Sequence, residues 1–335
     1  MIPIKRARRT VAVLAVPALL LTAACGSDSE PSGGDSESSA PASGPVATVS
    51  GEPDAPPEIS VDEDAEVGSE TVVEVINEGD GAEVKDGDFL RVDVVGRVMG
   101  ADMELLNTWN SAAEGEEGPR QQFVVQVGSA SSMPEAATTP LVGATVGSRV
   151  QVEGRVGDML GPTAQQAGFA EDDGVVWVFD IAAAATVDAT AQAEGEQAAT
   201  AEGMPEVTAE DGGAPAITIP EGQDPPGELQ EQVLIEGDGA EVAEGQGLIA
   251  QYVGVTWANG EKFDSSWDRE AASGFQIGTG SVVEGWDQGL VGKHVGDRVL
   301  LVIPPDMGYG DQEAGNGAIP AGSTLVFVVD IVGVV

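Results

Sequence analysis

Cysteine and histidine are almost absent from this chain of 335 residues. Cys25 is the only cysteine and His294 is the only histidine. A single cysteine excludes an intramolecular disulfide and a zinc site built from thiolates. A single histidine excludes a multi-histidine metal site, and a Ser-His-Asp triad would have to use His294, which we place in a solvated turn without a functional role. We therefore expect neither a metal site nor a cofactor.

Basic residues are also scarce. The chain has 14 Lys and Arg residues against 57 Asp and Glu residues, which gives a net charge of −43. Four of the 14 basic residues and none of the acidic ones precede Cys25, so the rest of the chain carries 10 basic residues against 57 acidic ones, a net charge of −47. Such a chain repels polyanions. We therefore expect no nucleic-acid partner.

The first 25 residues have the pattern of an export signal. A basic cluster precedes the apolar run Val11–Leu21, and small residues lead to Cys25. The run is shorter than the ~20 residues of a membrane-spanning helix. The four residues ending at Cys25 resemble a bacterial lipobox, although Thr22 replaces the usual leucine; the alternative is an ordinary signal peptide with Cys25 as a bystander. We predict a signal peptide over 1–24, lipidation of Cys25, and an extracytoplasmic protein held at the cell membrane by its lipid.

Two stretches contain few apolar residues. Residues 25–68 are mostly Ser, Gly, Pro, Asp, Glu and Ala, without an aromatic residue, and residues 186–224 are rich in Ala, Glu, Gly and Thr. Such segments cannot bury enough apolar surface to offset the entropy lost on ordering. We predict a disordered tether over 25–68 and an acidic linker over 186–224, where the Ala and Glu content would also allow transient helix.

The remaining sequence is an internal repeat. The segment Glu-Gly-Asp-Gly-Ala-Glu-Val occurs at 78–84 and again at 236–242, an offset of 158 residues. The segment Leu-Val-Gly occurs at 141–143 and at 290–292, an offset of 149, so the first copy contains a longer loop between these points. Ordered matches of this kind indicate two copies of one domain.

We assign the first copy to residues 69–185 and the second copy to residues 225–335. Runs rich in β-branched residues predict strands in the second copy over 248–256, 298–303 and 323–335. Asn259-Gly260 predicts a hairpin turn in which both residues tolerate positive φ. Apolar residues at helical spacing predict one short helix over 282–290. Several antiparallel strands and one short helix define an α+β fold in which the sheet wraps around the helix.

Nine short motifs of the second copy occur in a diagnostic order. They are Gln251-Tyr252-Val253-Gly254, Gly260-Glu261-Lys262-Phe263-Asp264-Ser265-Ser266, Phe275, Val282-Val283-Glu284-Gly285-Trp286, Gly289-Leu290-Val291-Gly292, Ile303-Pro304-Pro305, Tyr309-Gly310, Ala318-Ile319-Pro320 and Leu325-Val326-Phe327. In order and spacing the whole copy resembles the FKBP-type peptidyl-prolyl cis-trans isomerases. The resemblance implies that the chain carries two FKBP-like domains, the second of which is an isomerase.

The resemblance also implies a shallow apolar pocket for a prolyl ring. Trp286 matches the floor of the family's pocket, and Asp264 and Tyr309 match the polar groups that hydrogen-bond bound peptides or macrolide inhibitors. We expect Asp264, Tyr309, Trp286 and Phe275 to be catalytic. The residues expected to bind substrate are Tyr252, Phe263, Val282, Val283, Ile319 and Phe327. Taken singly, each aromatic residue could instead be a core residue, and Asp264 a turn residue.

The first copy lacks most of these side chains. Aligned by the offsets, Val94 replaces Tyr252, Leu105 replaces Phe263, Leu106 replaces Asp264, Trp177 replaces Phe327, and Phe123 retains the position of Phe275. Residues 131–139 contain no counterpart of Trp286. We predict an FKBP-like fold without isomerase activity, which could hold unfolded clients, contact the other copy or act as a spacer.

The function that the sequence predicts is peptidyl-prolyl cis-trans isomerisation that assists the folding of exported proteins. The expected partners are proline-containing peptides, unfolded secreted proteins, macrolide inhibitors and, through the lipid anchor, the membrane. One alternative is a non-catalytic peptide-binding or chaperone module at the cell surface. A purely structural role in the cell envelope has only the linkers and the charge to support it.

Overall fold

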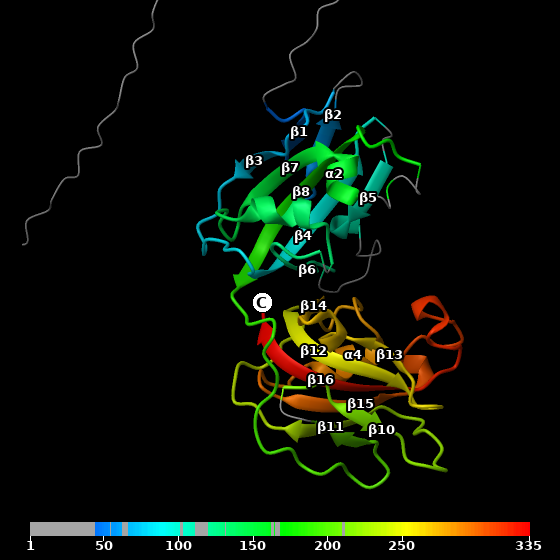
Figure 1. Ribbon diagram of the computed structural model, residues 1–335. Coiled ribbons are helices and arrows are strands. Elements are labelled where there is room, and N and C mark those ends of the chain that lie inside the picture. The colour runs from blue at the N-terminus through cyan, green and yellow to red at the C-terminus, as the bar shows by residue number, and fades with distance from the viewer. Residues whose placement is uncertain are drawn as a thin grey trace, which may run out of the picture. The chain divides into compact units, whose positions relative to one another are not determined.

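The computed structural model describes residues 44–335 apart from 54, 62–65, 101–102, 111–119, 131, 162–163, 165–167 and 210–211. The predicted signal peptide and the predicted lipidation site at Cys25 lie outside the described residues. Among the residues that are described, no helix is long and apolar enough to cross a membrane. Figure 1 shows two antiparallel sheets, one in each copy of the repeat, and few helices. This arrangement confirms the predicted α+β class.

The second copy contains a six-stranded antiparallel sheet. Its strand order is β11 (Gln230–Ile235), β15 (Arg298–Ile303), β16 (Leu325–Val334), β12 (Gly247–Thr256) and β13 (Lys262–Ser265), with β14 (Ser273–Gln276) also paired to β12. The three predicted strands are present as β12, β15 and β16. Helix α4 (Glu284–Leu290) packs its buried Trp286 and Leu290 against this sheet. It begins two residues later than predicted because Val283 is still extended.

The predicted hairpin turn joins β12 to β13, but its geometry differs from the two-residue type. Only Gly260 has a positive φ, of 67°, and Asn259 does not. The Gly260 N–H donates to the Thr256 carbonyl over 2.9 Å, and the Thr256 N–H donates to the Glu261 carbonyl over 3.0 Å. The turn is therefore longer than predicted, and a single glycine supplies the left-handed conformation that it needs.

The first copy repeats the sheet of the second. Its order is β3 (Val72–Asn77), β7 (Arg149–Arg155), β8 (Gly174–Ala185), β4 (Phe89–Val98) and β5 (Met103–Asn107), with β6 (Phe123–Gln126) also paired to β4. Among its described residues this copy has the short helices α1 (Glu135–Thr138) and α2 (Val156–Leu160). The two copies of the sequence repeat thus share the same strand order.

Strand pairing corrects one detail of the sequence alignment. Leu248 pairs with Phe275, and the equivalent Leu90 pairs with Val125. Val125, not Phe123, therefore holds the position of Phe275 in the first copy. The error of two residues keeps the side chain on the same face of the strand, which is why the apolar pattern alone did not reveal it.

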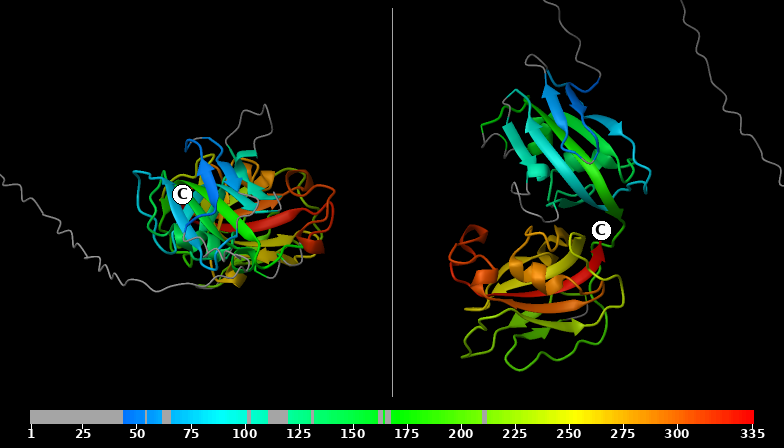
Figure 2. Two further views of the ribbon diagram at one scale, coloured as in Figure 1. Left: turned by 90° about the horizontal axis from the view of Figure 1, so that it is seen from above. Right: turned by 180° about the vertical axis from the view of Figure 1, so that it is seen from behind.

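Each copy also has a short hairpin in a segment that was predicted to lack structure. Strands β1 (Ala47–Ser50) and β2 (Glu58–Val61) pair within the predicted tether, and β9 (Glu206–Thr208) and β10 (Ala216–Thr218) pair within the predicted linker. The structure differs from the prediction because these few apolar residues find a partner outside their own segment. In Figure 2 both hairpins lie beside the sheet that follows them in the sequence.

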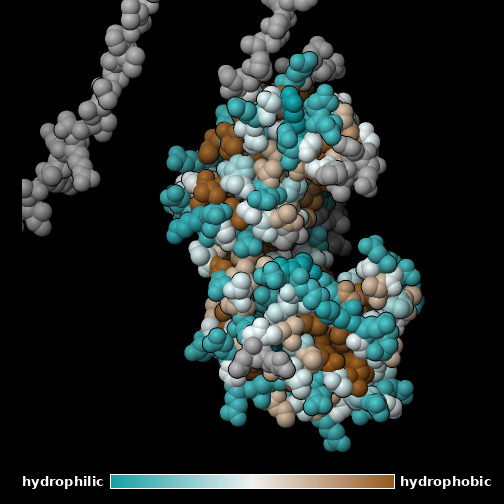
Figure 3. Space-filling model, in the orientation of Figure 1, coloured by the Kyte–Doolittle hydropathy of each residue, from teal (hydrophilic) through white to brown (hydrophobic). Residues whose placement is uncertain are grey.

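The partner is the outer face of each sheet, opposite the face that carries the helices. Val207 of β9 is 5% exposed and belongs to an apolar cluster with Val253, Val302 and Val328 of the second sheet. Ala47 and Val49 of β1 form the equivalent cluster on the first sheet. Both faces of each sheet are therefore covered. On the face shown in Figure 3, hydrophilic residues are interspersed with hydrophobic patches on both copies.

A buried ion pair ties each hairpin segment to its sheet. Arg298 donates twice to Asp330, at 2.7 Å each, and Asp330 also accepts the Ala193 N–H over 2.9 Å. In the first copy Arg149 donates to Asp180 and to the Ala55 carbonyl, both over 2.6 Å. Burial raises the pKa of Asp180, although the bonds from Arg149 oppose that rise.

Candidate functional site

The ten side chains predicted to form the site line one cavity of about 350 Å³ in the second copy. We call this cavity the aromatic pocket. Its lining consists of Tyr252, Phe263, Asp264, Phe275, Ser281, Val282, Val283, Trp286, Tyr309, Gly315, Ile319 and Phe327. Of these, Ser281 and Gly315 were not predicted. Residues spread over 76 positions of the sequence, from 252 to 327, are thus brought together by the fold.

Trp286 forms the centre of the pocket. Its ring lies 5.5 Å from that of Tyr252, 5.2 Å from that of Phe275 and 5.3 Å from that of Phe327, each nearly perpendicular to it. These edge-to-face contacts are a favoured arrangement of aromatic rings. Trp286 is only 4% exposed, and its indole N–H has no hydrogen-bond partner. The result is a rigid, largely apolar floor.

Glycine residues allow this floor to approach the sheet. A Cβ atom on Gly285 of α4 would lie 2.5 Å from the Ile303 side chain, and one on Gly289 would lie 2.7 Å from Leu301. A Cβ atom on Gly254 of β12 would lie 2.5 Å from the ring of Phe263. Such contacts are too short for any real side chain. The glycines of the motifs therefore position Trp286 and the pocket walls.

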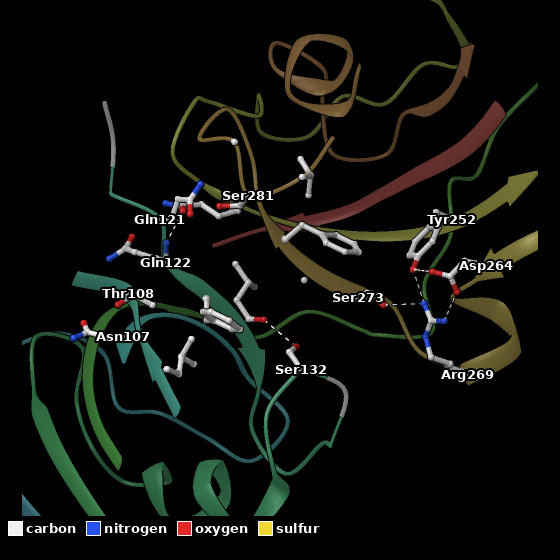
Figure 4. Close-up of a pocket in the computed structure, with 18 residues that line it drawn as sticks. Asn107, Thr108, Gln121, Gln122, Ser132, Tyr252, Asp264, Arg269, Ser273 and Ser281 are labelled. Carbon is white, nitrogen blue, oxygen red and sulfur yellow. Dashed lines mark hydrogen bonds and ion pairs between the residues drawn. The ribbon is translucent and has the colours of Figure 1, made fainter. Parts of the chain in front are cut away.

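A polar cluster lies at the rim of the aromatic pocket (Figure 4). The Tyr252 hydroxyl donates a hydrogen bond to Asp264. Arg269 donates to Asp264 over 2.5 Å and to the Tyr252 hydroxyl oxygen over 2.7 Å. The Ser265 N–H also donates to Asp264, over 2.8 Å. Asp264 is therefore held in one orientation by three donors.

The cluster moves the pKa values of its members away from neutral pH. Burial, and then the bond to the Asp264 carboxylate, raise the pKa of Tyr252. Burial would raise the pKa of Asp264, but hydrogen bonds from Tyr252 and Arg269 outweigh it and the pKa is lowered. Burial would likewise lower the pKa of Arg269, but its bond to Asp264 raises it. The carboxylate, the phenol and the guanidinium thus keep one charge state across the physiological range.

Tyr309 lies at the open side of the pocket. It is 44% exposed, and it follows a short turn at Pro305–Met307 that is closed by the bond from the Gly310 N–H to the Pro305 carbonyl, over 2.7 Å. Burial and then the charge of Asp264 raise the pKa of its phenol. An exposed, neutral hydroxyl at this place is available to a molecule in the pocket.

Arg269 is the site residue that sequence reasoning missed. It lies in a short helical turn, Trp267–Arg269, that ends at Glu270 with a left-handed φ of 58°. The available signal was the position of a rare basic residue five places after Asp264 in a very acidic chain. Nothing in the sequence showed that the turn would direct this guanidinium back toward Tyr252.

In the first copy, buried core residues stand at the equivalent positions. The offset of 149 places Ala137 at the position of Trp286, and Ala137 is fully buried. Trp177, at the position of Phe327, is 4% exposed and lies directly over Gly96, where a Cβ atom would come within 2.2 Å of its ring. Met133 and Met159 complete this core. The tryptophan of the floor is lost, and a larger, buried side chain, Trp177, stands at one wall position.

Comparison with known proteins agrees with this geometry. The family model of the FKBP-type peptidyl-prolyl cis-trans isomerases matches residues 239–332. An FK506-binding protein of Streptomyces anulatus is 46% identical over 120 residues, which is 36% of this chain and 96% of that protein. A probable FK506-binding protein of Corynebacterium glutamicum is 41% identical over 118 residues, which is 35% of this chain and 96% of that protein.

Among solved structures, the crystal structure of AtFKBP13 is 38% identical, covers 31% of this chain and 91% of its own, and has a TM-score of 0.30. The family model and the two relatives, each matched over nearly its whole length, show that the chain belongs to the family of FKBP-type peptidyl-prolyl cis-trans isomerases. It is therefore a peptidyl-prolyl cis-trans isomerase, and the residues that match the family model lie in the second copy.

Proposed function

We propose that the aromatic pocket receives the prolyl ring of the substrate and that isomerisation takes place there. The observation that supports this most strongly is the convergence of all ten predicted side chains on one cavity with a tryptophan floor. A prolyl ring is compact and apolar, and an aromatic floor surrounded by aliphatic walls buries it well. Asp264 and Tyr309 lie at the rim, where the backbone on either side of the proline would pass.

Prolyl isomerisation requires no reactive side chain in such a pocket. Rotation about an X-Pro bond has a barrier of about 18–20 kcal/mol because the amide loses its resonance when it twists. Each ~1.4 kcal/mol by which the site prefers the twisted form over the planar one increases the rate about tenfold. The pocket would hold the ring while the preceding carbonyl turns in a partly desolvated space, and no proton transfer or nucleophile is needed.

Asp264 and Tyr309 would act by orientation. Asp264 stays ionised and is already bonded to Arg269 and Tyr252, so it offers a fixed acceptor and not a proton. Tyr309 offers a hydroxyl with a raised pKa, which is a donor to a peptide carbonyl at neutral pH. These two groups would fix the orientation in which the peptide binds, and the apolar floor would stabilise the twisted X-Pro bond.

We further propose that the protein acts outside the cytoplasm. The export signal and the lipobox-like residues ending at Cys25 support attachment to the membrane through a lipid on that cysteine. The clients would then be exported proteins that are still unfolded and contain X-Pro bonds. Growth of cells with radiolabelled palmitate should label the wild-type chain and not Cys25→Ala, which should appear in the medium. Equal labelling of both chains would contradict the anchor.

Macrolides that bind the matched relatives, as the name FK506-binding protein states, would compete for the aromatic pocket of this chain. Their binding would use the same apolar floor and the same rim groups. We therefore expect FK506 to inhibit isomerisation competitively with a proline-containing peptide. Full activity in saturating FK506 would argue against this use of the pocket.

A pocket-filling variant tests the assignment of the prolyl site. Val283 lines the cavity and is half-buried, so Val283→Trp should fill the space without removing the floor. We expect kcat/KM for an Ala-Pro tetrapeptide, measured by NMR exchange on the full chain, to fall about 100-fold. The matched control is Val142→Trp in the first copy, at a side chain that is 46% exposed. Activity of Val283→Trp within twofold of the control would overturn the assignment.

A further inference from the structure

The two copies pack against each other through an apolar contact. Phe89 and Val124 of the first copy cluster with Ile249, Ala272 and Val335 of the second. Val124 sits directly on Gly274, where a Cβ atom would lie only 2.3 Å from the valine side chain. The absence of a side chain at position 274 is what allows β6 to approach β14 this closely.

One buried side chain adds polar bonds to this contact. Gln276 is 3% exposed. Its carbonyl oxygen accepts the Gln122 N–H over 2.6 Å, and its amide donates to the carbonyls of Arg120, over 3.1 Å, and Gly245, over 3.2 Å. Arg91 also donates to the Gly245 carbonyl, over 3.1 Å. These hydrogen bonds fix the position of β6 of the first copy against β14 of the second.

A cleft of about 700 Å³ opens beside this contact. We call it the inter-copy cleft. Residues of the first copy that line it include Leu106, Asn107, Gln121, Gln122, Phe123 and Ser132. It shares Tyr252, Asp264, Phe275, Ser281 and Val282 with the aromatic pocket. In Figure 4, Gln121 and Ser281 lie toward one end of the cleft, and Tyr252, Asp264 and Arg269 lie at the other. The cleft is therefore a continuation of the aromatic pocket toward the first copy.

The lining of the inter-copy cleft matches the chemistry of an extended polypeptide. Among the described residues that line it, Asp264 and Arg269 are the charged ones, and they pair with each other. The other polar residues are amides and alcohols, which can both donate to and accept from a peptide backbone. Leu106 and Phe123 offer apolar surface to side chains. Within the described lining no charge is left unpaired, so this part of the wall offers a strongly charged ligand no partner.

The two strands that border the cleft are edge strands. Within the part of the chain that the structure describes, β6 pairs only with β4 and β14 pairs only with β12. Edge strands keep backbone groups that can bond an added extended segment. On β6 the Val124 carbonyl already accepts the Ser132 hydroxyl over 3.2 Å, so the side chains of the cleft would supply most contacts to an unfolded client.

We propose that the inter-copy cleft binds the extended segment of an unfolded client next to the proline that occupies the aromatic pocket. The first copy thus contributes to substrate binding, although it has Ala137 in place of the tryptophan floor. This inference rests on the proposed function of the aromatic pocket and deepens it. The ligand class is an unfolded polypeptide that extends several residues beyond its X-Pro bond, in contrast to a short peptide that reaches the pocket alone.

Two substrates of different length distinguish the contribution of the inter-copy cleft from that of the aromatic pocket. One is an Ala-Pro tetrapeptide, and the other is an unfolded peptide of about 15 residues, roughly 50 Å when extended, with the same Ala-Pro bond at its centre. Isomerisation of both is measured by NMR exchange with the full chain and with Leu106→Glu, which places a charge in the cleft. The matched control is Val75→Glu, because Val75 is an apolar side chain of the first copy that is 48% exposed and lies outside the cleft.

We expect Leu106→Glu to raise KM for the long peptide about tenfold with an unchanged kcat, and to leave kcat/KM of the tetrapeptide within about twofold of wild type. Val75→Glu should change neither. Leu106 packs partly against the core of the first copy, so Ser132→Trp provides a second variant, at an exposed position that narrows the cleft. Ser132→Trp should also raise KM for the long peptide and leave kcat/KM of the tetrapeptide unchanged. Equal effects on the two substrates, or no effect on either, would overturn the inference.

A binding measurement keeps the two proposals distinguishable. The affinity of the long peptide, carrying a fluorophore, is measured by anisotropy with the full chain and does not depend on turnover. A tenfold loss of affinity in Ser132→Trp together with no turnover by the wild type would refute the proposed function of the aromatic pocket and support the cleft. Unchanged affinity together with normal turnover would refute the cleft and support the pocket.

Discussion

Replacement of Asp264 by leucine, the residue that occupies the equivalent position in the first copy, tests how the rim of the aromatic pocket is held together. The change removes the acceptor of the Tyr252 hydroxyl and the partner of Arg269. The ion pair itself contributes little, about 0–1 kcal/mol, because the two side chains are 44% and 41% exposed. The larger cost is the Tyr252 hydroxyl, since a buried donor without an acceptor costs about 1–3 kcal/mol.

We therefore expect Asp264→Leu to destabilise the second copy by about 2 kcal/mol and Tyr252→Phe by about 1.5 kcal/mol. The double variant contains no hydroxyl that lacks a partner, so it should cost about 2 kcal/mol. The coupling between the two sites is then about 1.5 kcal/mol. Hydrogen exchange of the full chain, read on peptides from β12 and β16, measures these values within the second copy alone.

The same variant should reduce kcat/KM for an Ala-Pro tetrapeptide by about tenfold, the value of one lost orienting hydrogen bond. It should not abolish turnover, because the floor around Trp286 is untouched. Strict additivity of the two substitutions would refute the idea that Tyr252 and Asp264 act as a unit. Loss of activity as complete as that caused by filling the pocket would refute the orienting role of Asp264.

The remaining predictions concern pH, the buried ion pairs and the outer hairpin. From about pH 5 to 9 kcat/KM should stay within twofold, because the pKa of Asp264 is lowered and those of Tyr252 and Tyr309 are raised. The stability due to Asp264 is lost only as the pH falls below the usual carboxyl pKa of about 3.9. A change in kcat/KM centred near pH 7 would contradict this prediction. Arg298→Met should destabilise the second copy by about 3–5 kcal/mol in hydrogen exchange because it leaves a buried carboxylate unpaired, and a cost below 1 kcal/mol would show that the pair is dispensable. A chain that begins at 225 should melt about 10 °C below one that begins at 186 because it lacks β9 and β10, whereas equal melting temperatures would mean that the hairpin adds nothing.

The sequence was most informative where residue identity and spacing carry the structure. The order of Tyr252, Phe263, Trp286 and Phe327 predicted a set of aromatic residues that the fold brings into one cavity. The β-branched runs predicted the three long strands of the second copy, because such runs are buried on both faces of a covered sheet. The repeat predicted the topology of the first copy.

Other features depend on contacts between distant segments and could not be predicted. The hairpin of β9 and β10 has few apolar residues, and it is ordered because Val207 meets a sheet face formed much later in the sequence. Arg269 reaches Tyr252 only because a short turn reverses the chain. The shift from Phe123 to Val125 preserves the alternation of the strand, so only the pairing register revealed it.

The most direct test of the account compares two buried tryptophans in the full chain. Trp286→Leu removes the floor of the aromatic pocket, and Trp177→Leu removes an equally buried indole, also without a hydrogen-bond partner, from the filled core of the first copy. Isomerisation of an Ala-Pro tetrapeptide is measured for both, with hydrogen exchange as the check that each copy remains folded. We predict that Trp286→Leu lowers kcat/KM by about 100-fold and that Trp177→Leu leaves it within about twofold of wild type. Equal activity of the two variants, with both copies folded, would contradict the placement of the isomerase in the aromatic pocket of the second copy.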